Sequence, residues 1–201
     1  MNVLGAIGSQ RVLPVLRLPS VDEAVRAAIA VLAAGLPLVE LTATTPGWEK
    51  ALTAVRGDLP PGCGVGLGTV TDAATAEAAI AAGAAFLVSP WAAPAVREVA
   101  AAADVLFLEG AFSPTEIAAA AAHGPVKVFP ASSLDPGYLR ALRPVLPRGT
   151  VLVPTGSIRL ADVPRWLDAG AYAVGVGGDL FTDDGRTVRL AELRAATTGV
   201  A

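Results

Sequence analysis

Residues 78–90 read AAIAAGAAFLVSP, and residues 166–178 read WLDAGAYAVGVGG. Both stretches pass from the end of a helix-forming segment through Ala-Gly and a small residue into a short apolar run. Alanine is the best helix former, and a short uninterrupted apolar run is typical of a strand buried in a parallel sheet. The shared pattern is about one strand–helix unit long and indicates a chain built from repeated units of this kind.

The same alternation extends from these stretches to both ends of the chain. Eight short apolar runs, separated by alanine-rich segments, are predicted to be strands: 12–17, 36–41, 64–68, 85–88, 105–108, 126–129, 151–153 and 172–176. Capping residues predict helix starts at Ser20, Thr45-Pro46, Thr71 and Ser113-Pro114, with a glycine stop at Gly35.

The length of the chain decides between two architectures. Eight strand–helix units need about 200 to 250 residues, and the chain has 201. An open doubly wound sheet of six or seven strands is the alternative. Because the alternation continues to the C-terminus, we predict an α/β fold with a single (β/α)8 TIM barrel domain over residues 1–201.

The composition argues against several classes of protein. Hydrophobic residues make up 53% and charged residues 16%, which supports a large core rather than disorder. The net charge of −3 and the absence of basic runs argue against nucleic acid binding. No stretch of about 18 uninterrupted apolar residues is present, and no basic segment precedes the first apolar run, so neither a membrane span nor a signal peptide is expected.

Cysteine and histidine are nearly absent. The single cysteine, Cys63, allows no internal disulfide and fits a reducing cytosol, so we expect a cytoplasmic protein. With one His and one Cys, and no clustered carboxylates, we expect no metal site. The glycine-rich run at 62–68 lies inside a predicted strand and lacks the spacing of a dinucleotide-binding loop.

Polar residues occur at the C-terminal ends of the predicted strands, where barrels carry their chemistry. These residues are Arg17, Glu40, Thr42, Thr69, Ser89, Glu109, Lys127 and Thr155. Burying an unpaired charge costs several kcal/mol, so a purely structural barrel would not place charges there.

Lys127 is the most informative of them. The chain has two lysines against 13 arginines, and this lysine lies inside the apolar run PVKVF at 125–129. Arginine cannot replace a lysine that must act as an amine nucleophile. Burial favours the neutral amine, which can attack a carbonyl carbon. The alternative is a lysine that extends to solvent or pairs with a buried carboxylate.

Glu40 and Arg17 each have a catalytic or binding interpretation and a structural one. Glu40, within LVELT at 38–42, could exchange protons beside Lys127, or it could form an ion pair with Lys127 or Arg17. Arg17 could bind a carboxylate through both guanidinium nitrogens, or it could pair with Glu40 or Glu109.

Glycine-rich turns follow the last two predicted strands, at 155–157 and 175–178. In many barrels this corner binds phosphate through backbone N–H groups, which glycine allows a ligand to approach closely. Ordinary tight turns are the alternative. Asp179 would repel a phosphate unless its carboxylate points away.

Taken together, these motifs resemble those of the 2-keto-3-deoxy-6-phosphogluconate aldolases and their 6-phosphogalactonate relatives, along nearly the whole chain. The matching motifs are LPVLR at 13–17, LVELT at 38–42, GLGTV at 66–70, FLVSP at 86–90, VKVFPA at 126–131, VPTG at 153–156 and VGG at 176–178. The segment at 45–49, Arg17 and Asp179 resemble the galactonate branch more closely.

The resemblance implies a class I aldolase, assembled as a homotrimer, that acts on a small 2-oxo acid without an external cofactor. By position, Lys127 would form a Schiff base and Glu40 would exchange protons. The other implied contacts to substrate are Arg17 and Thr69 for the carboxylate, Phe129 and Pro90 as walls, and Thr155, Gly156, Ser157, Gly177 and Gly178 for a distal phosphate. The implied reaction cleaves a 2-keto-3-deoxy-6-phospho sugar acid into pyruvate and glyceraldehyde 3-phosphate.

Several residues depart from the family pattern. Thr44 occupies a position where many members have arginine, Glu109-Gly110 replaces a usual Pro-Gly, and Trp91 and Ser157 replace frequent glycines. The negative charges of Glu109 and Asp179 favour a different acceptor, such as that of 4-hydroxy-2-oxoglutarate or an unphosphorylated sugar acid. A third possibility is a barrel that binds a metabolite without converting it, because a shared fold does not prove a shared function.

Overall fold

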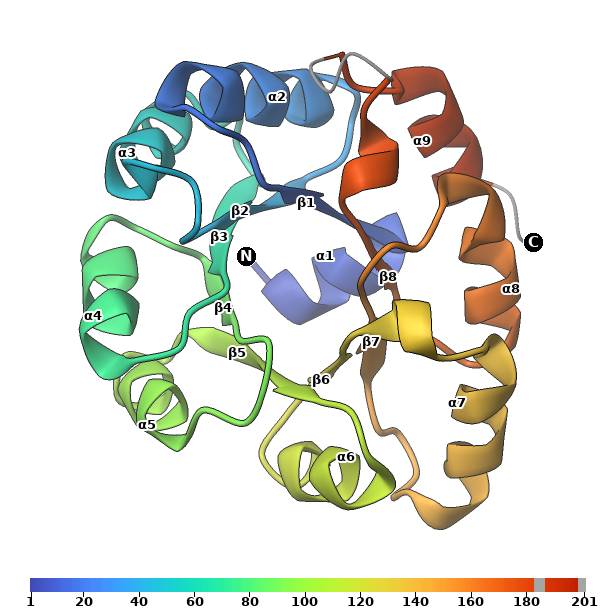
Figure 1. The fold of residues 1–201 in the computed structure, drawn as a ribbon. Helices are drawn as coiled ribbons and strands as arrows, with labels where there is room; N and C mark the ends of the chain where they lie inside the picture. Colours follow the sequence, from blue (N-terminus) through green and yellow to red (C-terminus); the bar gives the residue numbers. More distant parts are fainter. Residues whose placement is uncertain (183–186, 199–201) are drawn as a thin grey trace.

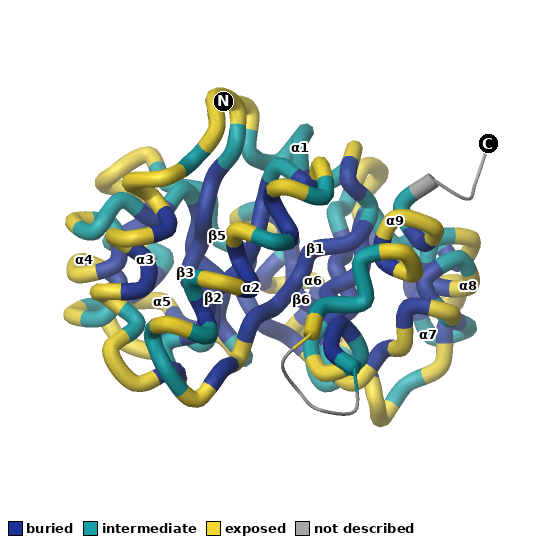
Figure 2. Tube along the Cα trace, turned by 90° about the horizontal axis from the view of Figure 1, so that it is seen from above, coloured by how far each residue is buried: buried dark blue, intermediate teal, exposed yellow. Residues whose placement is uncertain are grey.

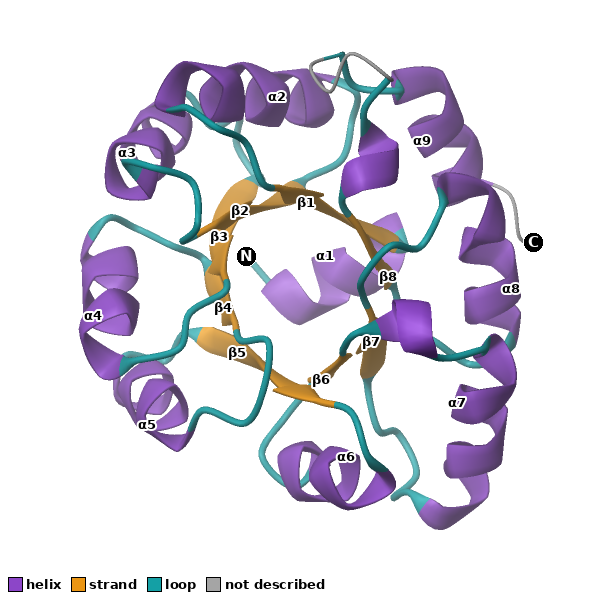
Figure 3. Cartoon of the chain, viewed as in Figure 1, coloured by secondary structure: helices purple, strands orange, loops and turns teal. Residues whose placement is uncertain are grey.

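The computed structural model describes residues 1–182 and 187–198, and its eight parallel strands form an inner ring (Figure 3). The strands are β1 Val12–Leu16, β2 Leu38–Thr42, β3 Gly64–Gly68, β4 Phe86–Val88, β5 Leu106–Ala111, β6 Val126–Val128, β7 Leu152–Pro154 and β8 Val174–Val176. Their order is β7-β6-β5-β4-β3-β2-β1-β8. The Tyr172 N–H donates to the Leu152 carbonyl at 2.9 Å, and a parallel bridge joins Thr155 to Gly175, which closes the ring. The predicted barrel is confirmed.

Helices surround the ring, and one follows each strand (Figure 1). The α-helices are α1 Val3–Gln10, α2 Val21–Ala33, α3 Trp48–Gly57, α4 Ala73–Ala81, α5 Pro94–Ala102, α6 Pro114–Ala121, α7 Pro136–Leu142, α8 Val163–Asp168 and α9 Leu190–Thr198. Short 3-10 turns lie at η1 Ala131–Ser133, η2 Arg143–Val145, η3 Leu160–Asp162 and η4 Gly178–Leu180. Among the described helices, none is long and apolar enough to cross a membrane.

Two of the predicted helix starts are confirmed. The Ser20 side chain accepts a hydrogen bond from the Glu23 N–H, and Ser113 forms a capping box with Glu116 at the start of α6. Each cap satisfies a backbone N–H that has no partner within the helix. Gly35, in the left-handed region at φ 93°, follows the end of α2 as predicted.

The other two predicted helix starts are wrong by one to three residues. Asp72 rather than Thr71 caps α4, and its carboxylate accepts from the Thr75 N–H at 2.8 Å. α3 begins at Trp48, beyond Thr45-Pro46, because the Thr45 hydroxyl accepts a hydrogen bond from the Leu18 N–H at 3.3 Å instead of capping a helix.

An N-terminal helix that the sequence did not predict covers the N-terminal end of the barrel (Figure 2). This helix, α1, places the side chain of Ile7 fully inside the protein. The buried Gln10 amide donates to the Leu38 carbonyl at 3.1 Å and accepts from the Leu38 N–H at 3.0 Å. The first residue of β2 is thereby bound on both of its backbone polar groups, as a buried backbone requires.

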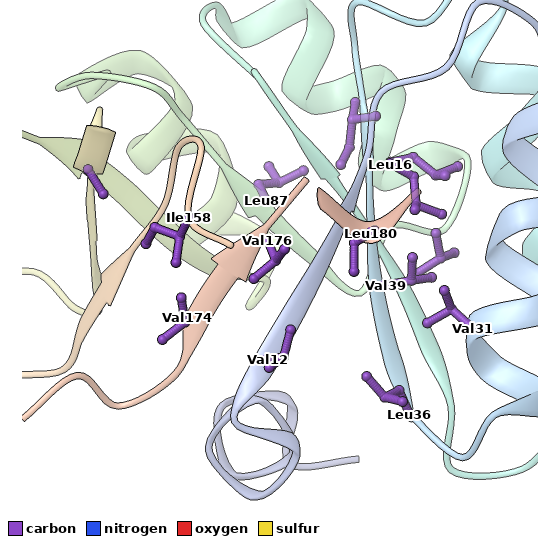
Figure 4. Close-up of a cluster of buried hydrophobic side chains, with 14 of the residues drawn as sticks. Val12, Leu16, Val31, Leu36, Val39, Leu87, Ile158, Val174, Val176 and Leu180 are labelled. Carbon is purple, nitrogen blue, oxygen red and sulfur yellow. The ribbon is translucent and has the colours of Figure 1, made fainter. Parts of the chain in front are cut away.

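The core has two layers, because successive strand residues point to opposite faces of the barrel wall. The inner layer packs Leu13, Leu38, Phe86, Val88, Leu108, Val153 and Ala173 around Ile7. The outer layer lies between strands and helices and includes Val12, Leu16, Val31, Val39 and Val176 (Figure 4). Apolar residues fill the N-terminal part of the barrel, which leaves the C-terminal part for polar side chains.

β5 is longer than predicted, and its length decides the direction of the Glu109 side chain. The strand runs to Ala111, three residues beyond the predicted end at Leu108. Leu108 packs in the inner layer, so Glu109 points outward, towards the helices.

Candidate active site

A cavity of about 420 Å³ lies at the C-terminal end of the barrel. Its lining consists of Val15, Arg17, Glu40, Thr69, Lys127, Phe129, Thr155, Gly156, Ser157, Gly177, Gly178 and Phe181. Every predicted site residue except Pro90 lines it. Val15 and Phe181 were not predicted, since neither is polar and Phe181 lies beyond the last predicted strand.

Lys127 and Glu40 face each other across the barrel interior. Lys127 Nζ lies 3.6 Å from Glu40 Oε1, and the two residues are 5% and 1% exposed. Both occupy inward positions on their strands, β6 and β2. The Lys127 ammonium also lies 5.4 Å from the centroid of the Phe129 ring, within the range of a cation–π contact.

Burial raises the pKa of Glu40 above its ordinary value of 4.5, and the positive charges of Lys127 and Arg17 offset part of that rise. Among the described residues, Glu40 Oε1 is the one buried side-chain N or O atom without a hydrogen-bond partner. A buried polar atom without a partner is costly and in a cavity indicates a place for a ligand or water. The carboxylate is therefore suited to hold and release a proton.

Gly68 makes room for that carboxylate. It lies on β3 beside Thr42 of β2, and a Cβ at this position would overlap Glu40 Oε1 and Cδ. A glycine is required here by close approach of a side chain rather than by its backbone angles.

Arg17 and Thr69 also line the cavity. Arg17 is exposed and makes no ion pair with any described residue, so its guanidinium is available to an anion. Thr69 has φ 61°, which is rare for a β-branched residue and costs about 1–3 kcal/mol. Lys127 and Arg17 against Glu40 give the cavity a positive balance, which suits an anionic substrate.

The two glycine-rich turns at 155–157 and 175–178, here called the glycine corner, form the other end of the cavity. The backbone N–H groups of Gly156, Ser157 and Gly177 donate no hydrogen bond to the described parts of the chain. Free amides at a turn are suitable donors to an anion. Asp179 points away, because its carboxylate accepts from the Leu160 N–H at 2.7 Å. The Asp179 carboxylate therefore does not face a phosphate bound in the cavity, and the expected repulsion does not arise.

Glu109 also lies outside the cavity. Its carboxylate accepts two hydrogen bonds from Arg97, at 2.9 and 3.0 Å, and one from the Ala93 N–H at 2.8 Å. The prediction that Glu109 brings negative charge close to the substrate was wrong, because the strand continues past Leu108 and turns this side chain outward.

Pro90 and Thr44 are not part of the cavity lining. The turn at Pro90 packs its backbone against Gly110, and the neighbouring Ser89 hydroxyl donates to the Trp91 carbonyl at 2.7 Å. The exposed Thr44 hydroxyl lies 3.0 Å from that of Thr42. Elsewhere in residues 1–182 and 187–198, no three His, Cys, Asp or Glu side chains gather closely enough to hold a metal ion.

Comparison with known proteins gives consistent matches over most of the chain. A family model described as KDPG and KHG aldolase matches residues 5–192. The 2-dehydro-3-deoxy-6-phosphogalactonate aldolase of Escherichia coli K12 is 29% identical over 177 residues, covering 87% of this chain and 86% of the relative. A 2-dehydro-3-deoxy-phosphogluconate aldolase of Pseudomonas aeruginosa is 34% identical over 162 residues, 78% of this chain and 72% of the relative.

Solved structures agree with these matches. A 4-hydroxy-2-oxoglutarate aldolase/2-deydro-3-deoxyphosphogluconate aldolase has a TM-score of 0.82 to this chain, at 33% identity, and the match covers 98% of each chain.

Proposed function

The chain belongs to the KDPG and KHG aldolase family, and from this membership we propose that it is a class I aldolase that cleaves a 2-keto-3-deoxy-6-phospho sugar acid to pyruvate and glyceraldehyde 3-phosphate. The observation that carries the proposal is the buried pair of Lys127 and Glu40, 3.6 Å apart in a cavity with positive charge balance. An amine nucleophile beside a proton-exchanging carboxyl group is what Schiff-base chemistry requires.

The first half of the reaction forms the covalent intermediate. The neutral amine of Lys127 attacks the C2 ketone carbon, and proton transfer gives a neutral carbinolamine. Because burial raises the pKa of Glu40, its carboxyl group can hold a proton and deliver it to the departing hydroxyl. Water leaves, the C2–N double bond of an iminium forms, and Glu40 becomes a carboxylate beside that positive charge.

The second half breaks the carbon–carbon bond. The Glu40 carboxylate takes the proton of the C4 hydroxyl, directly or through a water molecule. The electrons of the C3–C4 bond move towards the iminium, which gives an enamine and the free aldehyde. The enamine is protonated at C3, and water attack at C2 releases pyruvate and the free Lys127 amine. The covalent route divides one difficult cleavage into easier steps.

The two ends of the substrate have separate contacts in this proposal. Arg17 and Thr69 hold the carboxylate next to C2, as the family resemblance implies, and Arg17 is close enough to Glu40 to lower the pKa of that carboxyl group. The free amides of Gly156, Ser157 and Gly177 bind the distal phosphate.

An aldolase for 4-hydroxy-2-oxoglutarate or an unphosphorylated sugar acid is the second candidate. A solved structure whose name includes 4-hydroxy-2-oxoglutarate aldolase matches 98% of this chain. The carboxylates of Glu109 and Asp179 no longer favour it, because both point away from the cavity. Inhibition by inorganic phosphate is expected of the phosphorylated-substrate enzyme and not of the alternative.

The test of the mechanism is borohydride trapping with pyruvate, followed by peptide mass mapping. We expect one reduced adduct, on Lys127, which is lost in Lys127→Met and kept in Lys50→Met. The second variant removes the only other lysine of the chain. An adduct on Lys50, or none on the wild-type protein, contradicts the proposal and favours a barrel that binds a metabolite without converting it.

The family resemblance also supports assembly as a homotrimer. Light scattering coupled to size-exclusion chromatography measures the assembly directly, and a mass of one chain would contradict this part of the proposal.

A further inference from the structure

We infer that Phe181 determines substrate specificity by closing the end of the cavity at the glycine corner and limiting the length of the acceptor aldehyde. The inference rests on the proposed function and adds a residue that neither the sequence motifs nor the mechanism uses. Phe181 lines the cavity and is 8% exposed.

Phe181 belongs to the distal part of the cavity rather than to the reacting end. It directly follows η4, and its N–H donates to the Gly178 carbonyl at 3.2 Å. The other aromatic wall, Phe129, lies against Lys127 and Gly156. Phe129 thus reaches from the lysine to the near side of the glycine corner, whereas Phe181 follows the turn that carries Gly177 and Gly178. We therefore assign the pyruvate half to the end with Lys127 and the ring of Phe181 to the opposite end.

The backbone around Phe181 is fastened on both sides. The Arg189 Nε–H donates to the Phe181 carbonyl at 2.8 Å, and the Arg189 N–H donates to the Leu180 carbonyl at 2.7 Å. An antiparallel bridge joins Phe181 to Val188, and the Thr182 N–H donates to the Thr187 carbonyl at 2.8 Å. The backbone that carries the ring cannot shift for a longer ligand without breaking several hydrogen bonds, and the buried position of Phe181 leaves its ring little room to turn.

The groups available to bind a phosphate at the distal end explain why the Phe181 ring would select the length of the acceptor aldehyde. The corner offers backbone amides and the Ser157 hydroxyl, and among the residues that the structure describes Arg17 and Lys127 are the basic side chains of the lining. Amides at fixed positions bind a phosphate well only when the carbon chain brings it to them. In this inference the Phe181 ring forms the wall behind these amides, and it excludes a carbon chain that is one carbon longer. One carbon in an apolar pocket changes specificity by about 10- to 200-fold.

The experiment measures kcat/KM in the condensation direction, with pyruvate and either D-glyceraldehyde 3-phosphate or D-erythrose 4-phosphate, which is one carbon longer. In Phe181→Ala we expect the preference for the three-carbon aldehyde to fall by at least tenfold, through KM for the aldehyde. Phe181→Leu should give an intermediate preference, and its ratio decides the matter if Phe181→Ala does not fold. The control is Phe112→Ala, which removes a 39% exposed ring outside the cavity lining.

Borohydride trapping with pyruvate on the same proteins separates the two proposals. An adduct on Lys127 in every protein, with the wild-type preference unchanged in Phe181→Ala and Phe181→Leu, overturns the role of Phe181 and leaves the aldolase proposal standing. A loss of preference in Phe112→Ala equal to that in Phe181→Ala also overturns it. A wild-type protein that forms no adduct overturns the proposed function, and the inference about Phe181 with it.

Discussion

The Lys127 ammonium nitrogen lies 3.6 Å from Glu40 Oε1, and this oxygen has no hydrogen-bond partner in the described part of the chain. The pair is thus close enough for electrostatic coupling and too long for a firm hydrogen bond. A small movement, or one water molecule, connects the two groups, so a proton can pass between them during a reaction.

The coupling predicts how stability depends on pH in Lys127→Met. Burial raises the Glu40 pKa and Lys127 lowers it, so removal of the lysine raises it further. A carboxyl group whose pKa is higher in the folded protein than in the unfolded chain stabilises the fold only while it is protonated. This stabilisation is fully present below the unfolded pKa, near 4.5, and is lost as the pH rises through the folded pKa. We therefore expect the free energy of unfolding of Lys127→Met, measured in urea, to fall more than that of the wild type as pH rises above 4.5. Parallel curves for wild type, Lys127→Met and the control Lys50→Met would contradict the coupling.

The proposed proton transfer predicts the acid limb of the activity. In the free enzyme the Glu40 carboxylate must take a proton from the Lys127 ammonium to release the attacking amine, so kcat/KM should fall as pH drops through the raised Glu40 pKa, above 4.5. Glu40→Gln should reduce kcat by about 10²- to 10⁴-fold, and its residual activity should lack this limb. A Gln variant that keeps the wild-type acid limb would assign the limb to another group.

The ion pair of Glu109 and Arg97, outside the cavity, predicts that the loss of one partner lowers the free energy of unfolding more than the loss of the other. The Glu109 side chain is 3% exposed, whereas that of Arg97 is 30% exposed. Arg97→Ala leaves a buried carboxylate with one backbone donor and should cost about 3–5 kcal/mol. Glu109→Gln leaves a guanidinium that can reach water and should cost less, about 1–3 kcal/mol. Urea unfolding measures both values, and equal costs would argue against this account. Neither change should alter KM, since Glu109 does not face the cavity.

Asp179 links the 3-10 turns η3 and η4, which follow the two turns of the glycine corner, because its carboxylate on η4 accepts a hydrogen bond from the Leu160 N–H on η3. Asp179→Ala should loosen the corner and raise KM for the phosphorylated substrate by up to about 100-fold, since a hydrogen bond to a charged group contributes about 1.5–3 kcal/mol. The yield of the pyruvate adduct on Lys127 should stay unchanged. A lowered KM would indicate that Asp179 repels the substrate, as its charge alone suggested.

The barrel and most of the cavity lining could be predicted because both depend on local patterns. Each strand is a short apolar run, and a polar residue within or after such a run marks the end where parallel strands carry their side chains. The direction of Glu109 could not be predicted in this way. A charge directly after an apolar run indicates the end of a strand, whereas β5 continues through Glu109 to Ala111. Alternation counted from the buried Leu108 would have placed Glu109 on the outer face.

The remaining omissions depend on tertiary contacts. The segment that forms α1 has only a mild apolar character, and the helix is secured by the bonds of Gln10 to Leu38, 28 residues away. Phe181 follows a 3-10 turn beyond the last strand, where neither helix nor strand periodicity applies. Its place in the cavity depends on a hydrogen bond that Arg189 donates to its carbonyl and on one that its own N–H donates to the Gly178 carbonyl, which no short sequence pattern encodes.

The close approach of Gly68 to Glu40 gives the sharpest test of the site geometry. A methyl group at Gly68 would overlap the Glu40 carboxylate, which is buried and cannot turn to solvent without leaving Lys127. Gly68→Ala should therefore destabilise the protein by about 1–3 kcal/mol through overpacking, and should lower kcat/KM by about 10²-fold or more because a catalytic group is displaced.

The matched control for Gly68→Ala is Gly57→Ala, in α3, where an added Cβ meets no atom within 4 Å. This change should raise stability by about 0.5–1 kcal/mol, as alanine replaces glycine in a helix, and should leave kcat/KM unaltered. If Gly68→Ala were as active as Gly57→Ala, the carboxylate would not need its present position, and the proton transfer would have to be assigned elsewhere. A Gly68→Ala protein that keeps its pyruvate adduct but loses cleavage would instead place the requirement for Glu40 at the C3–C4 bond, because attack by Lys127 would then proceed without it.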